Sequence, residues 1–451
     1  MDRWHCEFDD LVSRIGARFG RVEPRRRVAG FVAGLLAELP RTNCWTIAGH
    51  AGDRDPRGMQ RLLSQAVWDE DGVRNDLRDY VVEHLADSDA VLVVDETGDL
   101  KKGTCTVGVQ RQYTGTAGRI ENSQVAVYLT YATRKGYAFI DRELYLPKAW
   151  AEDAERRAAA GVPDEVEFAT KPALAKAMID GAVTAGIPAG WAAGDEVYGA
   201  DPALRQALAG HGLGFVLAVA KSHPFTTGIG TRRAIDLAVR LPATAWQRIS
   251  AGDGAKGPRW YDWALIEVTD PALSSSDTSR DTTVGVNWLL IRRRISDGEY
   301  AFYRAHAPRP VPLADLVRVA GVRWKIEESF AGGKELAALD EHQVRTWRSW
   351  RRWTVLAMLA HAFLSVLTTA APPAPAQSDR DDNPAASQPR LIRLTRNEIR
   401  RLFTAAATVL RTLEHRLHWS RWRRHHQAIA RASHHRRRAD PRHDHEVSLE
   451  Y

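Results

Sequence analysis

The amino-acid sequence predicts an α/β protein built on a sheet of mixed direction. Three observations predict this class. Residues 1–88 carry apolar side chains at helical spacing, whereas residues 90–94 (Ala-Val-Leu-Val-Val) form a continuous run typical of a strand buried on both faces. The predicted strands first follow one another and then alternate with helices, an order that favours a mixed sheet. The 451 residues are enough for about three domains.

The chain after residue 88 divides into a core, an insertion and closing helices. In residues 89–220 we expect helices at 171–185 and 202–209 and strands at 90–94, 104–112, 124–133, 137–146, 191–194 and 215–220. This alternation breaks down in residues 221–308, where Gly, Ser, Thr and Asp become frequent between short strands at 263–268 and 287–292. We interpret this stretch as a β-rich insertion, after which residues 309–370 return to helix and complete the core.

The C-terminal part of the chain is strongly basic. Residues 371–390 are rich in Pro, Ala and Asp, a composition that predicts a disordered linker. Residues 391–451 hold 14 arginines against six acidic residues, although the whole chain carries a formal net charge of only +7. We expect an amphipathic helix at 395–417 within a tethered tail that contacts nucleic-acid phosphates. The alternative is that this helix packs on the core with its arginines solvated.

Composition and termini bear on the class of protein and its compartment. Three scattered cysteines (Cys6, Cys44 and Cys105) exclude a disulfide scaffold and a zinc ribbon, and they fit a reducing compartment. The first residues lack the apolar segment of a signal peptide. The most apolar stretch, residues 355–370, is shorter than the ~20 residues of a membrane-spanning helix and predicts a buried core helix. We therefore expect a soluble cytoplasmic protein.

Two aspartates follow predicted strands. Asp95 comes directly after the apolar run, and Asp195 ends the short strand at residues 191–194. Burying an unpaired carboxylate is costly, so each of these acids must be exposed at a sheet edge, paired, or bound to a cation. A single aspartate of this kind is usually a turn or cap residue. Two in one α/β domain favour a cleft at the carboxyl edge of the sheet.

A third acidic group lies on a predicted helix. At about 100° per residue, Arg323, Glu327 and Lys334 fall within roughly a sixth of a turn, so one helix face presents a cation, a carboxylate and a cation. The simpler interpretation is a solvated face with an i,i+4 ion pair. Gly332 and Gly333 count against it, because two glycines inside a helix are costly unless another backbone approaches closely.

The chemistry of these groups favours divalent-metal catalysis on a phosphodiester. Three carboxylates without a His/Cys cluster suit Mg²⁺ or Mn²⁺ and disfavour zinc. Two ions held by shared carboxylates can stabilise the attacking and leaving oxygens of an in-line displacement, and neighbouring Lys and Arg can hold the phosphate backbone. A two-carboxylate hydrolase such as a glycosidase is the other enzyme class, but it would not need the basic tail or the Arg-Glu-Lys face.

With these residues, the chain resembles a bacterial insertion-sequence transposase of the DDE, RNase H-like superfamily. It is similar to the cut-and-paste group with a β-strand insertion, whose third motif is Tyr-(x)2-Arg-(x)3-Glu-(x)6-Lys. Arg323, Glu327 and Lys334 match this motif at the right spacing, whereas Ala320 stands at the tyrosine position. Asp95 and Asp195 match the first two acids of the family, in the contexts Asp-x-Thr and Asp-x-x-Tyr. The resemblance covers roughly residues 10–370.

The resemblance implies an RNase H-like core and a set of roles for single residues. Asp95, Asp195 and Glu327 would be catalytic and would ligate two Mg²⁺ ions, with Mn²⁺ as a substitute. Arg323 and Lys334 would bind DNA. Trp288 matches a tryptophan that stacks on a base flipped out of the DNA end. The alternative, to which we give equal weight, is that Trp288 packs in the core.

The resemblance also implies an activity and partners. The helical domain at residues 1–88 would bind the terminal inverted repeats of double-stranded DNA, and the core would cleave them and join the freed 3′ ends to target DNA. The protein would act as a homodimer on paired ends, in the bacterial cytoplasm at the nucleoid. The alternative is a domesticated, transposase-derived DNA-binding protein without transposition activity.

Overall fold

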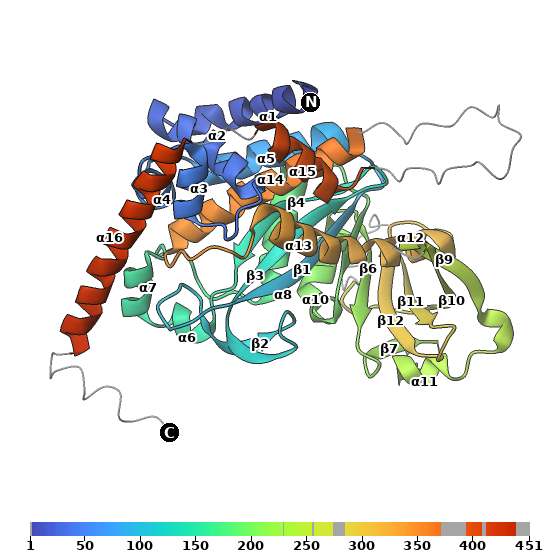
Figure 1. Ribbon diagram of the computed structural model, residues 1–451. Helices are drawn as coiled ribbons and strands as arrows, with labels where there is room; N and C mark the ends of the chain where they lie inside the picture. The colour runs from blue at the N-terminus through green and yellow to red at the C-terminus, as the bar shows by residue number, and fades with distance from the viewer. Residues whose placement is uncertain are drawn as a thin grey trace, which may run out of the picture.

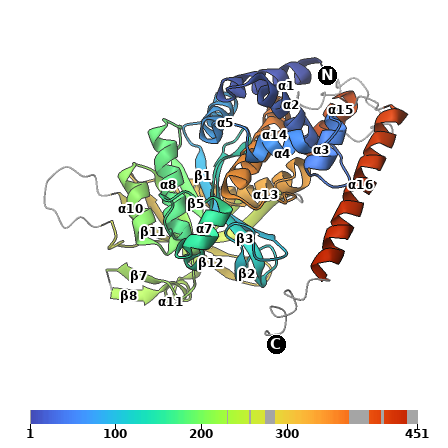
Figure 2. The same ribbon diagram turned by 90° about the vertical axis from the view of Figure 1, so that its left-hand side faces the viewer.

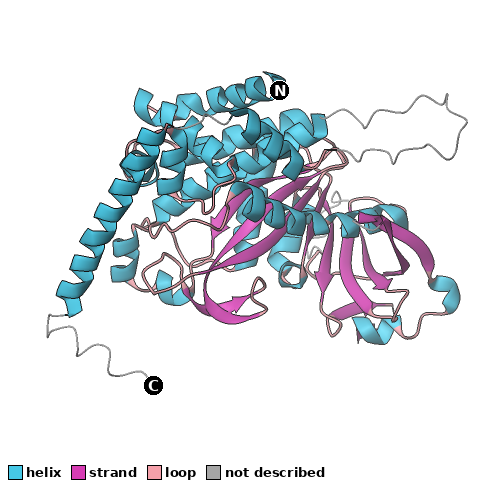
Figure 3. Ribbon diagram, viewed as in Figure 1, coloured by secondary structure: helices cyan, strands magenta, loops and turns pink. Residues whose placement is uncertain are grey.

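The computed structural model describes residues 2–228, 230–254, 257–273, 285–370, 394–407 and 412–438. It is a mixed α/β structure in which a large mixed sheet lies beneath a helical N-terminal region (Figures 1 and 3). The expected class is therefore confirmed. The linker expected at residues 371–390 lies outside the described residues.

The N-terminal region is a helical layer stabilised by capping side chains. Asn43 and Thr46 form a reciprocal capping box at the start of α3, and Asp69 accepts a hydrogen bond from the Gly72 amide at the start of α5. Phe31 of this layer packs edge-on against Trp353 of α14 (Trp347–Ala370), with 5.5 Å between ring centroids. The helices are α1 (Asp2–Ile15), η1 (Gly16–Arg18), α2 (Val22–Leu36), α3 (Cys44–Ala51), α4 (Arg57–Ser64) and α5 (Glu70–Leu85).

The sheet joins ten strands of the described chain in one continuous ladder system. Their order is β2-β3-β1-β5-β6-β12-β11-β10-β9, with β4 pairing β3 as well. The β1–β5 and β5–β6 pairs are parallel, and the other pairs are antiparallel. The strands are β1 (Val91–Leu100), β2 (Gln110–Thr114), β3 (Arg119–Ala132), β4 (Tyr137–Leu144), β5 (Trp191–Gly194), β6 (Gly214–Val219), β9 (Gln247–Gly254), β10 (Gly257–Glu267), β11 (Val286–Arg293) and β12 (Tyr300–Ala307).

Two strand boundaries differ from the sequence-based expectation. β1 does not end at Asp95 but continues to Leu100, because the 14-residue strand β3 supplies partners as far as Ser123. The strand expected at residues 104–112 begins only at Gln110, because its pairing with β3 starts there. In both cases the partner strand sets the boundary.

The stretch at residues 221–308 extends the same sheet. β12 pairs with β6, with Phe302 opposite Val219, so the strands β9–β12 continue the core ladder sideways (Figure 1). A small second apolar core lies here, around Phe225, Leu237 and Leu289. The remaining elements of this stretch are β7 (Pro224–Thr227) and β8 (Gly230–Arg233), which form a separate hairpin, α11 (Ala234–Ala238) and η2 (Ala243–Ala245).

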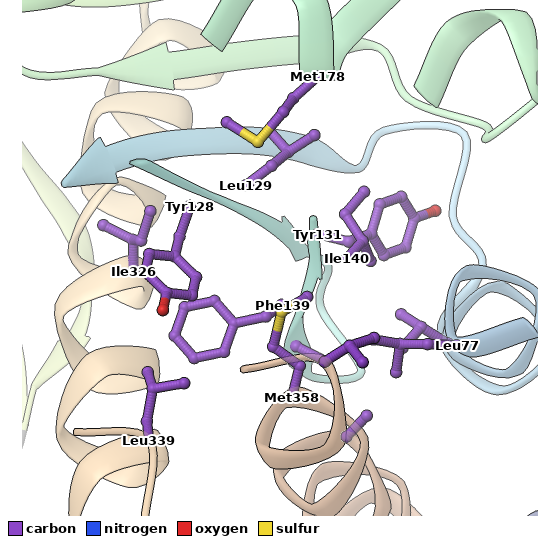
Figure 4. Packing of buried hydrophobic residues seen from close by; sticks show 14 of the residues in the cluster. Leu77, Tyr128, Leu129, Tyr131, Phe139, Ile140, Met178, Ile326, Leu339 and Met358 are labelled. Carbon is purple, nitrogen blue, oxygen red and sulfur yellow. The ribbon is translucent and has the colours of Figure 1, made fainter. Parts of the chain in front are cut away.

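Helices cover both faces of the core strands. In Figure 4, Leu129 of β3 points toward Met178 of α8, whereas its neighbour Tyr128 points toward Ile326 of α13. Alternation along β3 thus assigns the two helices to opposite faces. Figure 2 shows α8 and α10 on the side away from α13 and α14. The helices are α6 (Lys148–Ala151), α7 (Ala154–Ala160), α8 (Lys171–Thr184), α9 (Glu196–Gly199), α10 (Pro202–Gly210), α12 (Leu313–Val322), α13 (Trp324–Ala337) and α14 (Trp347–Ala370).

The apolar stretch at residues 355–370 forms the last two thirds of α14. This helix is long and apolar enough to cross a membrane by length and composition, but 83% of its most apolar window is buried inside the protein. It contacts β4, α5, α13 and α2. The prediction of a buried core helix is confirmed.

The basic C-terminal segment is docked on the rest of the protein. α15 (Arg396–Ala407) buries Ile399 and Phe403, and the Phe403 ring lies 5.1 Å from that of Phe363 in α14. α16 (Leu413–Arg438) follows as a separate helix. The expectation of a free tether beginning with one helix at 395–417 is therefore wrong for the described residues, because apolar side chains at helical spacing pack against α14. For α15, the alternative interpretation holds.

Candidate active site

Two parallel strands bring Asp95 and Asp195 side by side. β1 and β5 pair in parallel with Val93 opposite Ala193. Continuing this register by two residues puts Asp95 beside Asp195, on the same side of the sheet because residues two apart share a face. Asp95 remains within β1, whereas Asp195 leaves β5 and becomes the N-cap of α9, where its Oδ1 accepts a hydrogen bond from the Val197 amide at 2.9 Å.

Helix α13 carries the third acid, Glu327, and Arg323 links this acid to Asp95. α13 packs along β1, and Arg323 stands at its start. Arg323 Nη1 lies 3.4 Å from Asp95 Oδ2 and 4.0 Å from Glu327 Oε1, so one guanidinium joins these two carboxylates. The neighbouring acid Glu328 points elsewhere, because it accepts hydrogen bonds from Tyr137 Oη at 2.6 Å and from Lys325 Nζ at 2.9 Å. Glu327, and not Glu328, is thus the residue that faces Asp95.

The electrostatics of the site favour the binding of positive charge. Burial and the nearby Asp195 carboxylate raise the pKa of Asp95 well above its usual range, although Arg323 opposes this shift. Burial, followed by the charge of Glu96, likewise raises the pKa of Asp195. Asp95 and Asp195 thus both have raised pKa values, and Arg323 contacts only the first of them, so the negative charge of the site is only partly compensated.

Glu96, which the sequence reasoning missed, supports the site from the opposite face of β1. Its carboxylate accepts a hydrogen bond from Lys171 Nζ at 2.6 Å and from Tyr198 Oη at 2.7 Å. Tyr198 is fully buried and lies three residues after Asp195. These contacts tie β1 to the starts of α8 and α9. The available signal was the Asp-Glu pair at residues 95–96 together with the Asp-x-x-Tyr context of Asp195.

Lys334 lies farther along the same face of β1. Its Nζ donates to Thr97 Oγ1 at 2.8 Å and lies 4.0 Å from Asp99 Oδ1, while His342 Nε2 lies 3.2 Å from the other oxygen of Asp99. Since Asp95, Thr97 and Asp99 alternate onto one face, the helix face predicted to carry Arg323, Glu327 and Lys334 follows this strand.

Gly332 and Gly333 of α13 were expected to allow the close approach of another backbone, but the structure shows a different role for them. A Cβ on Gly333 would lie 3.0 Å from Phe139 Cε2, and one on Gly332 would lie 3.3 Å from His361 Nε2. The close neighbours are therefore side chains of β4 and α14, not another backbone. The glycines allow α13 to lie tightly on these two elements.

A cavity of about 440 Å³ opens beside the acids. Asp195 and Arg323 line one side of it, and strands of the insertion line the other. Ala320, which stands at the tyrosine position of the motif, also faces this space, as do the basic side chains Arg259 and Arg292. The aromatic residues of the lining are Tyr261, Trp263, Tyr300, Phe302, Tyr303 and Trp324.

Trp288 is not one of the residues that line this cavity. It lies in β11 opposite Ala305, is 6% exposed and belongs to the main apolar core. This placement matches the core alternative stated for it, and no indole surface is presented to the acids. Base stacking by Trp288 stays a prediction that this arrangement does not favour.

The acids do not form a closed metal-binding cluster in this arrangement. Within the described parts of the chain, no three His, Cys, Asp or Glu side chains come close enough together to hold an ion. The donor chemistry nevertheless suits a hard divalent cation, because Asp95, Asp195 and Glu327 offer only carboxylate oxygens. Arg323 occupies the space between Asp95 and Glu327 as a cation would.

Comparison with known sequences agrees with this geometry. Residues 15–228 match the family described as DDE superfamily endonuclease. The matched stretch includes Asp95 and Asp195, whereas Arg323, Glu327 and Lys334 lie beyond it. The two aspartates that the strand register brings together thus fall inside the segment that carries the family likeness.

A curated relative supports the same likeness. The chain is 28% identical over 167 residues to a protein of Microchaete diplosiphon named "Probable transposase for insertion sequence element IS701". The match covers 37% of this chain and 41% of that protein, so it spans less than half the length of either. The chain is a distant homologue of this transposase and similar to DDE superfamily endonucleases.

Proposed function

We propose that the protein is the DNA transposase of an insertion sequence, which binds the terminal inverted repeats and catalyses DNA strand cleavage and strand transfer. One observation carries the proposal: the β1–β5 register, continued by two residues, puts Asp95 beside Asp195, and Arg323 connects Glu327 to Asp95. The likeness of residues 15–228 to DDE endonucleases supports an RNase H-like core around these acids. Double-stranded DNA would be the substrate and a homodimer on paired ends the active form, in the bacterial cytoplasm at the nucleoid.

Asp95, Asp195 and Glu327 would hold two Mg²⁺ ions, for which Mn²⁺ would substitute. Such ions supply charge stabilisation and nucleophile activation in phosphoryl displacement. The protein groups contribute binding and orientation. Arg323 and Lys334 lie on the same face as the acids and bind the phosphates on either side of the cleaved bond, and burial of Asp95 keeps bulk water away from the reacting phosphate.

The aromatic cavity next to Asp195 would hold the nucleotide beside the cleaved bond. Its volume of about 440 Å³ falls within the ~300–1,000 Å³ typical of small-ligand sites. Tyr261 lies against the Arg292 guanidinium, which is 4.6 Å from the ring centroid, so a base entering the cavity meets both an aromatic and a cationic surface. In this proposal the cavity residues take the stacking role first considered for Trp288.

Single acid substitutions test the catalytic assignment. Asp95→Asn, Asp195→Asn and Glu327→Gln should each abolish Mg²⁺-dependent cleavage of a plasmid that carries the DNA flanking the gene. Gel-shift binding to that DNA should persist, because phosphate contacts elsewhere supply most of the affinity. Glu328→Gln is the matched control, since this neighbouring acid binds Tyr137 and Lys325 away from the site, and it should still cleave.

Two outcomes would contradict the proposal. If Glu327→Gln cleaves as fast as the parental protein, Glu327 is not one of the catalytic acids. If the parental protein binds the flanking DNA but cleaves with neither Mg²⁺ nor Mn²⁺, the domesticated DNA-binding protein is the correct alternative.

A further inference from the structure

The outer wall of the N-terminal region forms, together with α16, a large groove remote from the acids. The groove has a volume of about 1250 Å³ and lies between α3, α4, residues 343–349 and α16. Trp45, Trp353 and Trp419 line it, and four arginines, Arg41, Arg345, Arg416 and Arg423, surround these indoles. Among the residues that the structure describes, no acidic side chain is part of the lining.

The four arginines are available to a ligand. All of them are exposed, and none forms an ion pair with another described residue. Cations from three separate parts of the chain therefore converge without a counter-charge. Such a surface is suited to a polyanion with regularly spaced charges and flat apolar groups, which is the chemistry of nucleic acid.

One face of α16 fixes this helix to the N-terminal region. Trp419 is 4% exposed and donates its indole N–H to the Asp53 carbonyl at 3.0 Å. The Trp422 and His426 rings stack on each other and meet Trp45 of α3 edge-on, at 4.6 and 4.7 Å between centroids. Trp419, Trp422 and His426 thus form an aromatic mounting face, by which α16 is attached to the N-terminal region. This face ends near the middle of the 26-residue helix.

A second face of the same helix lines the groove. Arg416, Arg423 and Gln427 are spaced by seven and four residues, so they form one stripe next to the mounting face. Beyond His426 about 12 residues, or ~18 Å of helix, project away from the protein body (Figures 1 and 2). Residues 415–438 contain eight arginines and no acidic residue.

We propose that this groove binds the phosphate backbone of the duplex at the end of the element, while the projecting part of α16 lies in the adjacent major groove. The ~10–12 Å diameter of a helix fits the ~12 Å width of the major groove. Because the mounting holds α16 in a fixed register, its side chains read base edges in addition to binding phosphates. Selection of the element's end therefore depends on α16. This inference rests on the proposed function.

The groove also connects end binding to the catalytic helix. Arg345 lies in the segment that joins α13, which carries Glu327, to α14. A phosphate bound to Arg345 on one side and to Arg416 on the other is thus held by the catalytic core and by the C-terminal helix at once. DNA in the groove would tether the element's end to the domain that cleaves it.

Fluorescence anisotropy of the full-length protein tests the groove. The probes are labelled 40-bp duplexes taken from the DNA on each side of the gene and a scrambled duplex of equal composition, titrated over a range of KCl concentrations. Arg416→Gln/Arg423→Gln should make the negative slope of log affinity against log salt shallower by about 2, since each neutralised phosphate contributes about −0.9. The matched control, Arg134→Gln/Arg309→Gln, removes two exposed arginines that line neither cavity and should leave the slope unchanged.

A second variant tests end selection. Trp419→Ala releases the mounting, so the preference for the flanking duplexes over the scrambled one should fall about tenfold or more while binding to the scrambled duplex persists. Circular dichroism checks that each variant is folded. An unchanged slope for the groove variant would overturn the proposal and would favour an acidic protein as the partner of the groove.

The remaining outcomes separate this inference from the proposed function. If Trp419→Ala weakens binding to all duplexes equally, α16 is a sequence-indifferent phosphate binder, and end selection by this helix is refuted. A parental protein that cleaves plasmid DNA and selects the flanking duplexes regardless of these substitutions refutes the groove alone. A parental protein that neither cleaves nor selects refutes the transposase proposal, and the groove inference falls with it.

Discussion

The close packing of α9 on β6 makes the position of Asp195 sensitive to one methyl group. Gly199 ends α9, four residues after Asp195. A Cβ at Gly199 would lie 2.0 Å from the Ala218 carbonyl oxygen and 3.0 Å from its carbon. These atoms belong to the backbone of β6 and cannot rotate away. Gly199→Ala must therefore separate the helix from the strand.

The size of the effect follows from these distances. Raising a 2.0 Å contact to the ordinary 3.4 Å requires a displacement of about 1.4 Å. Overpacking of this kind typically costs ~1–3 kcal/mol of folding stability. Asp195 caps α9 and moves with it, and a misplacement of about 1 Å in a catalytic site can lower the rate ~10²-fold. We expect a loss of both stability and cleavage.

Thermal unfolding and Mg²⁺-dependent plasmid cleavage measure the two effects. Gly210→Ala is the matched control, because Gly210 ends α10 and a Cβ there would lie more than 4 Å from every described atom outside its own helix and chain neighbours. The control should unfold and cleave like the parental protein, whereas Gly199→Ala should be less stable and about 10²-fold slower. Parental stability and rate in Gly199→Ala would refute the argument that α9 positions Asp195.

Two further predictions concern the buried ionic cluster that connects α10 of the core to the insertion. Asp270, 1% exposed, lies 2.8 Å from Arg205 and 3.2 Å from Arg304, so Asp270→Asn should leave uncompensated buried cations and cost ~3–5 kcal/mol in denaturant unfolding. Burial opposes ionisation of Asp270, but these arginines outweigh it and lower the pKa of Asp270. The difference in the free energy of unfolding between the parental protein and the variant should therefore be full above pH 3.8 and shrink as the pH falls below that value. Burial, then Arg304, lowers the pKa of His223 from 6.5 to about 4, so the unfolded chain takes up the proton first and stability should fall as the pH drops from 6.5 toward 4. His223→Gln should flatten this part of a melting-temperature profile, and an unchanged slope would contradict the assignment.

Local sequence patterns predicted those parts of the fold that depend on short-range physics. The strand at residues 191–194 and the helix beginning at residue 171 match β5 and the start of α8, because apolar runs and capping signals act within a few residues. The alignment of Arg323, Glu327 and Lys334 on one helix face also follows from helical geometry alone. The large mixed sheet and the helical N-terminal region are confirmed at the level of class.

Other features depend on partners that are distant in the chain. The extension of β1 to Leu100 depends on the length of β3, and the contact of the insertion with the core depends on the pairing of β12 with β6. The sequence offered the Asp-Glu pair as a signal for Glu96, but its role became visible only through its contacts with Lys171 and Tyr198 on other elements. The burial of Trp288 likewise depends on strands β10 and β12, which pair with β11 on either side.

The sequence by itself determined the chemistry available to this protein: three carboxylates with flanking cations, and a C-terminal segment dominated by arginine. Only the tertiary structure decided how these groups are arranged. The parallel register of β1 and β5 places Asp95 beside Asp195, and Trp419 and Trp422 fix α16 to α3. The physical reason is that charge and periodicity are properties of a local segment, whereas register and aromatic packing require two surfaces that meet only after the chain has folded.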